Sequence, residues 1–116
     1  MSDDASCFFC GIVSGENETE FVYADDHVVA FRDIHPQAPV HVLVIPRRHI
    51  VDFAELPEAE SAEAGQIVQS VARAAAAVAT PRGYRVVANR GPDASQSVFH
   101  LHFHVLSGRQ MSWPPG

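Results

Sequence analysis

Three histidines alternate with apolar residues near the end of the chain, at His100, His102 and His104. This period of two is typical of a β-strand, on which side chains two positions apart point to the same face. We therefore expect the three imidazoles to share one face of a strand. The opposite face would carry the apolar side chains Phe99, Leu101, Phe103 and Val105. Imidazoles in a row suit two kinds of chemistry, the binding of a metal ion and the handling of an anion.

The residues alone leave three interpretations of this histidine row open. A catalytic zinc site is one, although three ligands from consecutive alternate positions are awkward and the nearest carboxylate is Asp93. Ordinary core or surface histidines are the second. The third is attack on phosphorus by one neutral imidazole whose other nitrogen donates to a fixed acceptor. Protonated neighbours would then neutralise phosphate oxygens, and Gln96 and Ser97 would add hydrogen-bond donors.

A second group of reactive side chains lies near the start of the chain, where Cys7 and Cys10 form a C-x-x-C motif. Such a motif is a redox centre, half of a metal site, or two buried thiols. A thioredoxin-like redox centre requires a strand before the motif and a helix beginning at it. Only a short polar stretch precedes Cys7, so half of a zinc site is the favoured interpretation.

Composition limits the class of protein. The chain has 116 residues and a formal net charge of −6, with no lysine. This length predicts one domain spanning 1–116, and the negative charge argues against binding to nucleic acid. The sequence contains no apolar run long enough to cross a membrane, and its first residues are acidic, unlike those of a secretory signal. We therefore expect no membrane partner and a cytoplasmic location.

The expected elements indicate an α+β fold with a mainly antiparallel sheet. Alternating or β-branched segments predict five strands, at residues 21–24, 28–33, 40–46 and 84–89 and in the histidine segment. The segment 40–46 is almost continuously apolar, so we place it at the centre of the sheet, buried on both faces. Apolar residues at helical spacing predict one long helix over 57–80. The stripe on this helix comprises Ala64, Ile67, Val68, Val71, Ala72, Ala75 and Val78. A short helical turn is expected over 7–13 and a disordered tail over 1–6.

Residues 100–106 resemble the His-φ-His-φ-His-φ-φ signature of the histidine-triad (HIT) superfamily, where φ is apolar. The resemblance extends over most of the chain. Segments 31–34, 36–41 and 44–46 are similar to the family's nucleoside-binding region, and 84–89, Gly91 and 96–98 to its phosphate-site region. The last residues, 108–116, resemble the C-terminus of the Hint branch. This branch implies a HIT-like fold whose five-stranded sheet is extended across a homodimer.

The resemblance also implies an activity, hydrolysis of purine nucleoside phosphoramidates (AMP- or GMP-linked amines) through a nucleotidyl-histidine intermediate. His102 takes the position of the nucleophile, and His104 and His41 take those of phosphate-site histidines. The other residues that correspond to nucleotide-binding positions are Asp33 for the ribose, Asn89, Gln96 and Ser97 for the phosphate and scissile bond, and Phe9, Ile12 and Ile34 for the base. No catalytic cofactor is implied.

Two further features follow from the same resemblance. The C-terminal tail, residues 108–116, would lie at the dimer interface, with Trp113 reaching the partner's active site. Members with a C-x-x-C near the start hold a structural zinc ion, for which the ligands here would be Cys7, Cys10, His49 and His100.

Two alternatives to the phosphoramidase remain. One is a dinucleoside polyphosphate hydrolase, against which the Trp113 tail argues. The other is a purine-nucleotide-binding regulatory protein with weak catalysis. His35 departs from the small polar residue common at its position and borders the ribose-binding turn, whereas Arg32 occupies a variable position.

Overall fold

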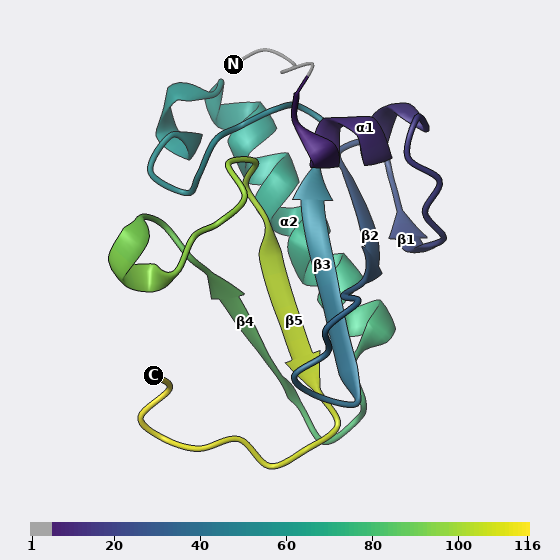
Figure 1. Cartoon of the computed structure of the whole chain (residues 1–116), viewed down its shortest axis with the longest axis vertical. Coiled ribbons are helices and arrows are strands. Elements are labelled where there is room, and N and C mark those ends of the chain that lie inside the picture. The colour runs from purple at the N-terminus through teal and green to yellow at the C-terminus, as the bar shows by residue number, and fades with distance from the viewer. Residues whose placement is uncertain (1–5) are drawn as a thin grey trace.

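The computed structural model describes residues 6–116, and all but the last residue of the expected tail lies outside this range. Two helices and five strands make up the fold (Figure 1). In chain order they are α1 (Phe8–Ser14), β1 (Phe21–Ala24), β2 (Val28–Arg32), β3 (Val40–Pro46), α2 (Ser61–Val78), β4 (Tyr84–Ala88) and β5 (Phe103–Ser107). Two 3-10 turns, η1 (Leu56–Glu58) and η2 (Pro92–Ala94), lie in the connections. The predicted α+β class is confirmed.

The strands form one sheet in the order β1-β2-β3-β5-β4, and each of its four pairings is antiparallel. The apolar strand β3 occupies the centre, as its composition predicts, and is buried from His41 to Pro46. β3 pairs with β5 so that Leu43 lies opposite His104 and Val44 opposite Phe103. The central strand therefore fixes the position of the histidine segment.

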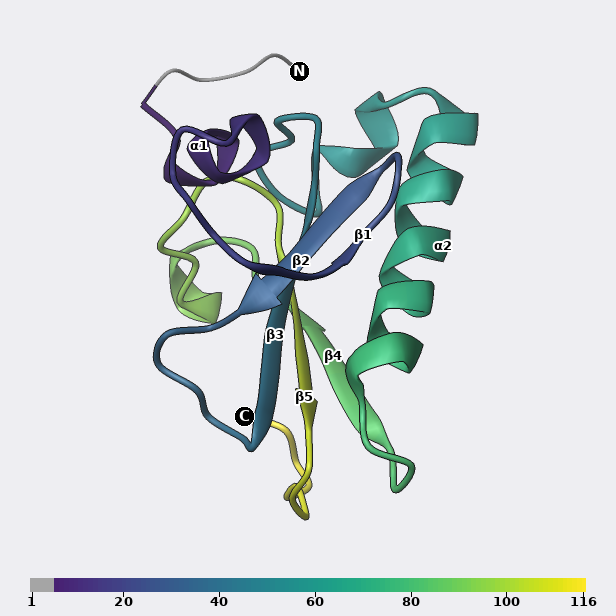
Figure 2. The same cartoon turned by 90° about the vertical axis from the view of Figure 1, so that its right-hand side faces the viewer.

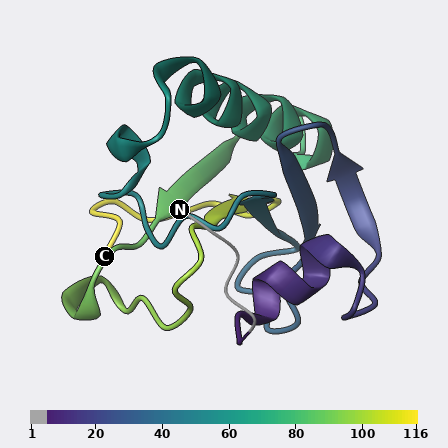
Figure 3. The same ribbon diagram turned by 90° about the horizontal axis from the view of Figure 1, so that it is seen from above.

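Each face of the sheet packs against a helix, and the two helices lie on opposite sides (Figure 3). α2 runs along one face and contacts β1, β2 and β3 (Figure 2). Its residues Ile67, Val71, Ala74 and Ala75 join Val44 and other strand residues in the larger apolar core. Full burial of an aliphatic side chain such as Ile67 stabilises the fold by about 1.5–3 kcal/mol. No helix among residues 6–116 is both long and apolar enough to cross a membrane.

The other face carries a smaller core under α1. This core comprises Phe9, Ile12, Val29, Phe31, Leu43 and Ile45. Cys7 caps the start of α1, where its sulfur accepts a hydrogen bond from the Cys10 amide at 3.3 Å, and Gly15 caps the end in the left-handed conformation (φ 88°). A glycine adopts this conformation without strain, which explains where the short helix stops.

The predicted long helix was wrong at both ends and on part of its buried stripe. Pro57 belongs to the separate turn η1, and α2 spans only Ser61–Val78. Val68 is 49% exposed, and Ala72 is also exposed. Ser70 and Ala74 are buried where the predicted stripe omitted them. The sequence pattern defined a stripe wider than the face that the sheet can cover.

The histidine strand begins later than predicted. β5 starts at Phe103, so His100 and His102 precede it. The Leu101 amide donates to the Ile50 carbonyl in the loop after β3, rather than to a neighbouring strand. Phe99 was expected on the apolar face but is 61% exposed, whereas Leu101, Phe103 and Val105 are buried as predicted.

Candidate active site and metal centre

The His102 side chain lies just before β5, on the face of the sheet that α1 covers. Its ring packs edge-on against Phe9, with the ring centres 5.4 Å apart, and lies 5.2 Å from the ring of His104. The His102 Nδ1 atom is 2.9 Å from the carbonyl oxygen of His100. Because a carbonyl can only accept, Nδ1 carries the proton and donates it. The Nε2 atom of the neutral ring then keeps a lone pair, as a nucleophile requires.

His104 on β5 and His41 on β3 face each other across neighbouring strands. The His41 Nε2 and His104 Nδ1 atoms are 2.8 Å apart. The Asp33 carboxylate, which follows β2, lies 3.4 Å from the same His41 Nε2 atom. The sheet register therefore brings His104 next to Asp33 and His41, which come from a much earlier part of the chain.

His104 is neutral at physiological pH in this arrangement. Its burial and the neighbouring rings of His102 and His41 lower its pKa to about 4, although the Asp33 carboxylate opposes this shift. The sequence-based idea that neighbouring histidines are protonated therefore does not hold for His104 in the free site. In the free site, His104 is therefore a neutral ring that can offer one N–H as a hydrogen-bond donor.

The other predicted nucleotide-binding residues surround this group at different depths. Phe9 and Ile12 are buried in the core under α1, and Ile34 is 86% exposed. Asn89 follows β4 and is half-buried, whereas Ser97 is exposed in the loop before the triad.

The Gln96 side chain stabilises its own loop. Its Oε1 atom accepts from the Gly91 amide at 3.0 Å, and Nε2 donates to the Val51 and Val98 carbonyls. Its amide is therefore engaged with the backbone in this structure.

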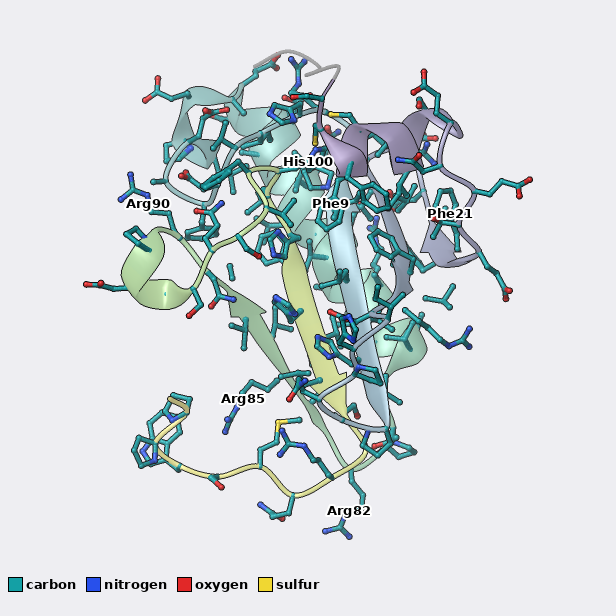
Figure 4. The ribbon with its side chains drawn as sticks, in the orientation of Figure 1. Phe9, Phe21, Arg82, Arg85, Arg90 and His100 are labelled. Atoms are coloured by element: carbon teal, nitrogen blue, oxygen red, sulfur yellow. The ribbon has the colours of Figure 1, made fainter. Side chains whose placement is uncertain are left out.

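Four donor atoms converge beside the histidine site. The His100 Nδ1 atom lies 3.4 Å and 3.5 Å from the sulfur atoms of Cys7 and Cys10 and 3.2 Å from His49 Nδ1. The sulfur of Cys10 is 3.2 Å from the same His49 atom. Figure 4 shows His100 next to Phe9 at the end of the sheet where α1 lies. These are the four residues that the resemblance implied as metal ligands.

The hydrogen bonding of His100 suits metal binding. Its Nε2 atom is 2.9 Å from the carbonyl of Pro46, which can only accept. Nε2 therefore carries the proton, and the Nδ1 lone pair points toward the thiols. A tetrahedral zinc ion separates its ligand atoms by roughly 3.3–3.8 Å, given bonds of about 2.0–2.3 Å. The donor spacing fits such an ion after small adjustments.

The backbone acceptors that determine the tautomers of these rings are not recognisable in the sequence. The carbonyls of His100 and Pro46 fix the tautomers of His102 and His100. No side-chain pattern reveals them, because every residue has a carbonyl and only the folded chain decides which one meets a ring.

A protein-family model described as "HIT domain" matches residues 14–111. The chain belongs to the HIT family. A HIT family hydrolase from Legionella pneumophila Philadelphia 1 superposes with a TM-score of 0.81 at 40% identity, covering 96% of this chain and all of that one. The predicted family and the HIT fold are thereby confirmed, and the function of this HIT protein is of hydrolase type.

Two curated relatives of this HIT protein carry functional names. A "14 kDa zinc-binding protein" from Zea mays is 42% identical, over 98% of this chain and 91% of the relative. "Adenylylsulfatase HINT1" from Arabidopsis thaliana is 40% identical, over 97% of this chain and 78% of the relative.

Proposed function

We propose that this HIT protein hydrolyses purine nucleoside phosphoramidates, in which an amine is linked to AMP or GMP. The tautomer of His102 carries the proposal. Its Nδ1–H is bound by the His100 carbonyl at 2.9 Å, so Nε2 is the free, nucleophilic nitrogen. His104 stands beside it as a neutral donor, because its pKa is lowered to about 4.

The reaction follows from these two rings. His102 Nε2 attacks the α-phosphorus, the P–N bond breaks, and the amine leaves with its electron pair and gains a proton. Water then attacks phosphorus, breaks the P–N bond to His102, and releases the nucleoside monophosphate. Hydrogen bonds from His104 and Ser97 would stabilise charge on the phosphate oxygens in both steps.

Residues around His102 and His104 would bind the nucleotide. Asp33 has carboxylate oxygens suited to ribose hydroxyls. Asn89 and Ser97 would bind near the phosphate and the scissile bond, and Gln96 would hold the loop beside them through its hydrogen bonds to the backbone. Phe9, Ile12 and the exposed Ile34 would line the base pocket.

We also propose that Cys7, Cys10, His49 and His100 hold a structural zinc ion. The convergence of four donor atoms supports this, as does the Zea mays relative named as a zinc-binding protein. Four protein ligands would close the coordination shell, so such an ion would stabilise the fold without taking part in the reaction.

A homodimer formed through β4 is the third part of the proposal. β4 is an edge strand, and Tyr84 and Val86 are 48% and 41% exposed. They lie on the same face of the sheet as Val105 and the core under α2, at the edge beyond the strands that α2 mainly contacts. Pairing of two β4 strands would extend the sheet and cover these side chains. Trp113 is 83% exposed on the C-terminal tail and would reach the active site of the partner.

A steady-state assay tests the function. We expect a higher kcat/KM for an adenosine phosphoramidate than for a diadenosine polyphosphate. Adenylyl sulfate is a third substrate to compare, because one relative is named an adenylylsulfatase. Faster turnover of the polyphosphate would identify the second enzyme class instead. Inertness toward all three, with AMP still bound, would identify a nucleotide-binding regulator.

A further inference from the structure

The backbone of Gln37 determines which nitrogen of His41 carries a proton. The Gln37 amide donates to His41 Nδ1 at 3.0 Å. An amide N–H can only donate, so Nδ1 must hold a lone pair. Neutral His41 therefore has its proton on Nε2, and a second proton on Nδ1 would break this hydrogen bond.

The same constraint passes to His104. Because His41 Nε2 carries the proton, it donates across the 2.8 Å separation to His104 Nδ1. His104 then keeps its own proton on Nε2. The Asp33 carboxylate, 3.4 Å from His41 Nε2, is a second acceptor for the same proton.

The proton on His41 Nε2 also argues against a metal site formed by Asp33, His41 and His104. The ligand atoms of Asp33, His41 and His104 lie close enough together to hold a metal ion. Ligation through His41 Nε2 requires a lone pair at an atom that here holds hydrogen. The Gln37 amide therefore favours a hydrogen-bond chain over a two-histidine, one-carboxylate metal site.

The C-terminal tail holds Gln37 in place. Arg109 Nε donates to the Gln37 carbonyl at 2.9 Å, so Gln37 is bound through both its N–H and its C=O. Gly108 has a φ of 95°, and a Cβ there would lie 3.0 Å from the Pro39 Cβ atom. Pro36 and Pro39 flank Gln37 and restrict the loop further. The start of the tail thus packs against the loop whose Gln37 amide fixes the tautomer of His41.

We infer that Arg109 and the Gln37 backbone form a positioning device that fixes the tautomers of His41 and His104. Through it, the site presents an Nε2–H on His104, beside the bare Nε2 that the His100 carbonyl leaves on His102. These are the two groups that nucleophilic attack and phosphate stabilisation require, so this inference rests on the proposed function. Arg109 acts through Gln37 and His41 and touches no reacting atom.

Nitrogen NMR of the histidine rings tests the tautomers without any substrate. In protein labelled with ¹⁵N at histidine, we expect a protonated Nε2 on His41 and His104 and a protonated Nδ1 on His102 at neutral pH. A protonated Nδ1 on His41 would overturn the inference. Because this readout does not depend on turnover, it is separate from a failure of the proposed phosphoramidase activity.

Variants of the tail test the role of Arg109. Arg109→Met should mix the two His41 tautomers in the ring spectrum and lower kcat about tenfold, with KM changed less than about twofold. Arg109→Lys keeps a donor and should restore kcat to within about twofold of wild type. Arg82→Met is the matched control, because Arg82 is exposed beside the same tail. Unchanged His41 ring signals in Arg109→Met, or an equal loss of kcat in Arg82→Met, would overturn the inference.

Discussion

At the scale of single residues, one backbone atom fixes the tautomer of His102 and another fixes that of His41. The His100 carbonyl directs the proton of His102 to Nδ1, and the Gln37 amide directs that of His41 to Nε2. Under the proposed function, chemically identical side chains would thus serve as a nucleophile and a donor. The assignment depends on hydrogen-bond direction, since an amide can only donate and a carbonyl can only accept.

Removal of the His102 ring should separate catalysis from binding. His102→Ala deletes the covalent step, so kcat should fall by roughly 10³-fold or more while the Kd for AMP changes little. Mass spectrometry of a quenched wild-type reaction should find the nucleotidyl adduct on His102. An adduct on another residue would refute the assignment. His27→Ala is a matched control, because His27 lies in the turn between β1 and β2.

Asp25 gives the fold a predictable response to acid. Burial opposes ionisation, but hydrogen bonds from the His27 and Val28 amides and the Tyr23 hydroxyl lower the pKa of Asp25 from 3.8 to about 2. A lowered pKa means that the folded state favours the carboxylate. This stabilisation is complete above the unfolded-state value and is lost as pH falls from about 4 to about 2.

Asp25→Asn should therefore reduce the decrease in the free energy of unfolding between about pH 4 and pH 2. We expect a loss of about 1 kcal/mol at neutral pH, after allowance for solvent screening of this partly exposed group. Urea unfolding between pH 7 and pH 2 measures it. Asp26→Asn, at the exposed neighbouring position, is the comparison. Equal pH dependence in the Asp25 variant and wild type would contradict the prediction.

At the scale of elements, only a narrow face of α2 packs against the sheet. Ile67 is 2% exposed and packs in the core, whereas its neighbour Val68 is 49% exposed. Ile67→Ala should lower the free energy of unfolding by about 2–4 kcal/mol, because it leaves a cavity. Val68→Ala should change it by less than about 0.5 kcal/mol. Denaturant unfolding of the pair distinguishes the two faces, and equal losses would show that the predicted, wider stripe is buried after all.

The sequence predicts where most strands lie, but not that β5 starts later than the alternating pattern does. The bounds of β1 and β3 agree with expectation, because β-branched runs end at turn residues or proline. The delayed start of β5 could not be foreseen. His100 and His102 keep the alternation of a strand, but their backbone and ring atoms bind the Ile50 loop, the Pro46 carbonyl and each other.

The same division applies to the site. The alternation of His100, His102 and His104 and the C-x-x-C motif are recognisable from spacing. His41 and His49 are implied only by the resemblance to the HIT family, and the structure brings each set together. The roles of Gln37 and Arg109 are not recognisable, because they act through main-chain contacts that arise only from the path of the loop and the tail.

At the scale of the whole molecule, the four residues of the proposed metal site come from three segments. Cys7 and Cys10 come from the start of α1, His49 from the loop after β3, and His100 from the approach to β5. An ion at this point would cross-link parts of the chain that are otherwise joined mainly by packing.

Removal of zinc should therefore affect stability more than catalysis. We expect protein purified without added metal to contain about one zinc ion per chain, and a chelator to lower its Tm while kcat changes less than about twofold. Cys7→Ser should lose the metal and show the same drop in Tm. Absence of zinc from the wild type would rule out the metal proposal, and loss of kcat on chelation would imply a catalytic ion.

The exposed edge strand β4 is where we propose that two copies of the chain pair. Val86 lies on β4 and is 41% exposed. Val86→Asp places a charge where two β4 strands would meet, so it should turn a dimer into a monomer. Sedimentation analysis measures the change. Glu63→Gln on α2, away from β4, serves as the control, and a monomeric wild type would exclude the dimer.

The side chain and the main chain of His100 make different contacts. Its ring faces the thiols, while its carbonyl orients the ring of His102. Every amino acid supplies the same carbonyl, so replacement of the His100 side chain leaves that hydrogen bond available. A lineage could thus lose its metal ligands one by one and still inherit an aligned nucleophile. The two centres are neighbours in space, but they are free to evolve separately.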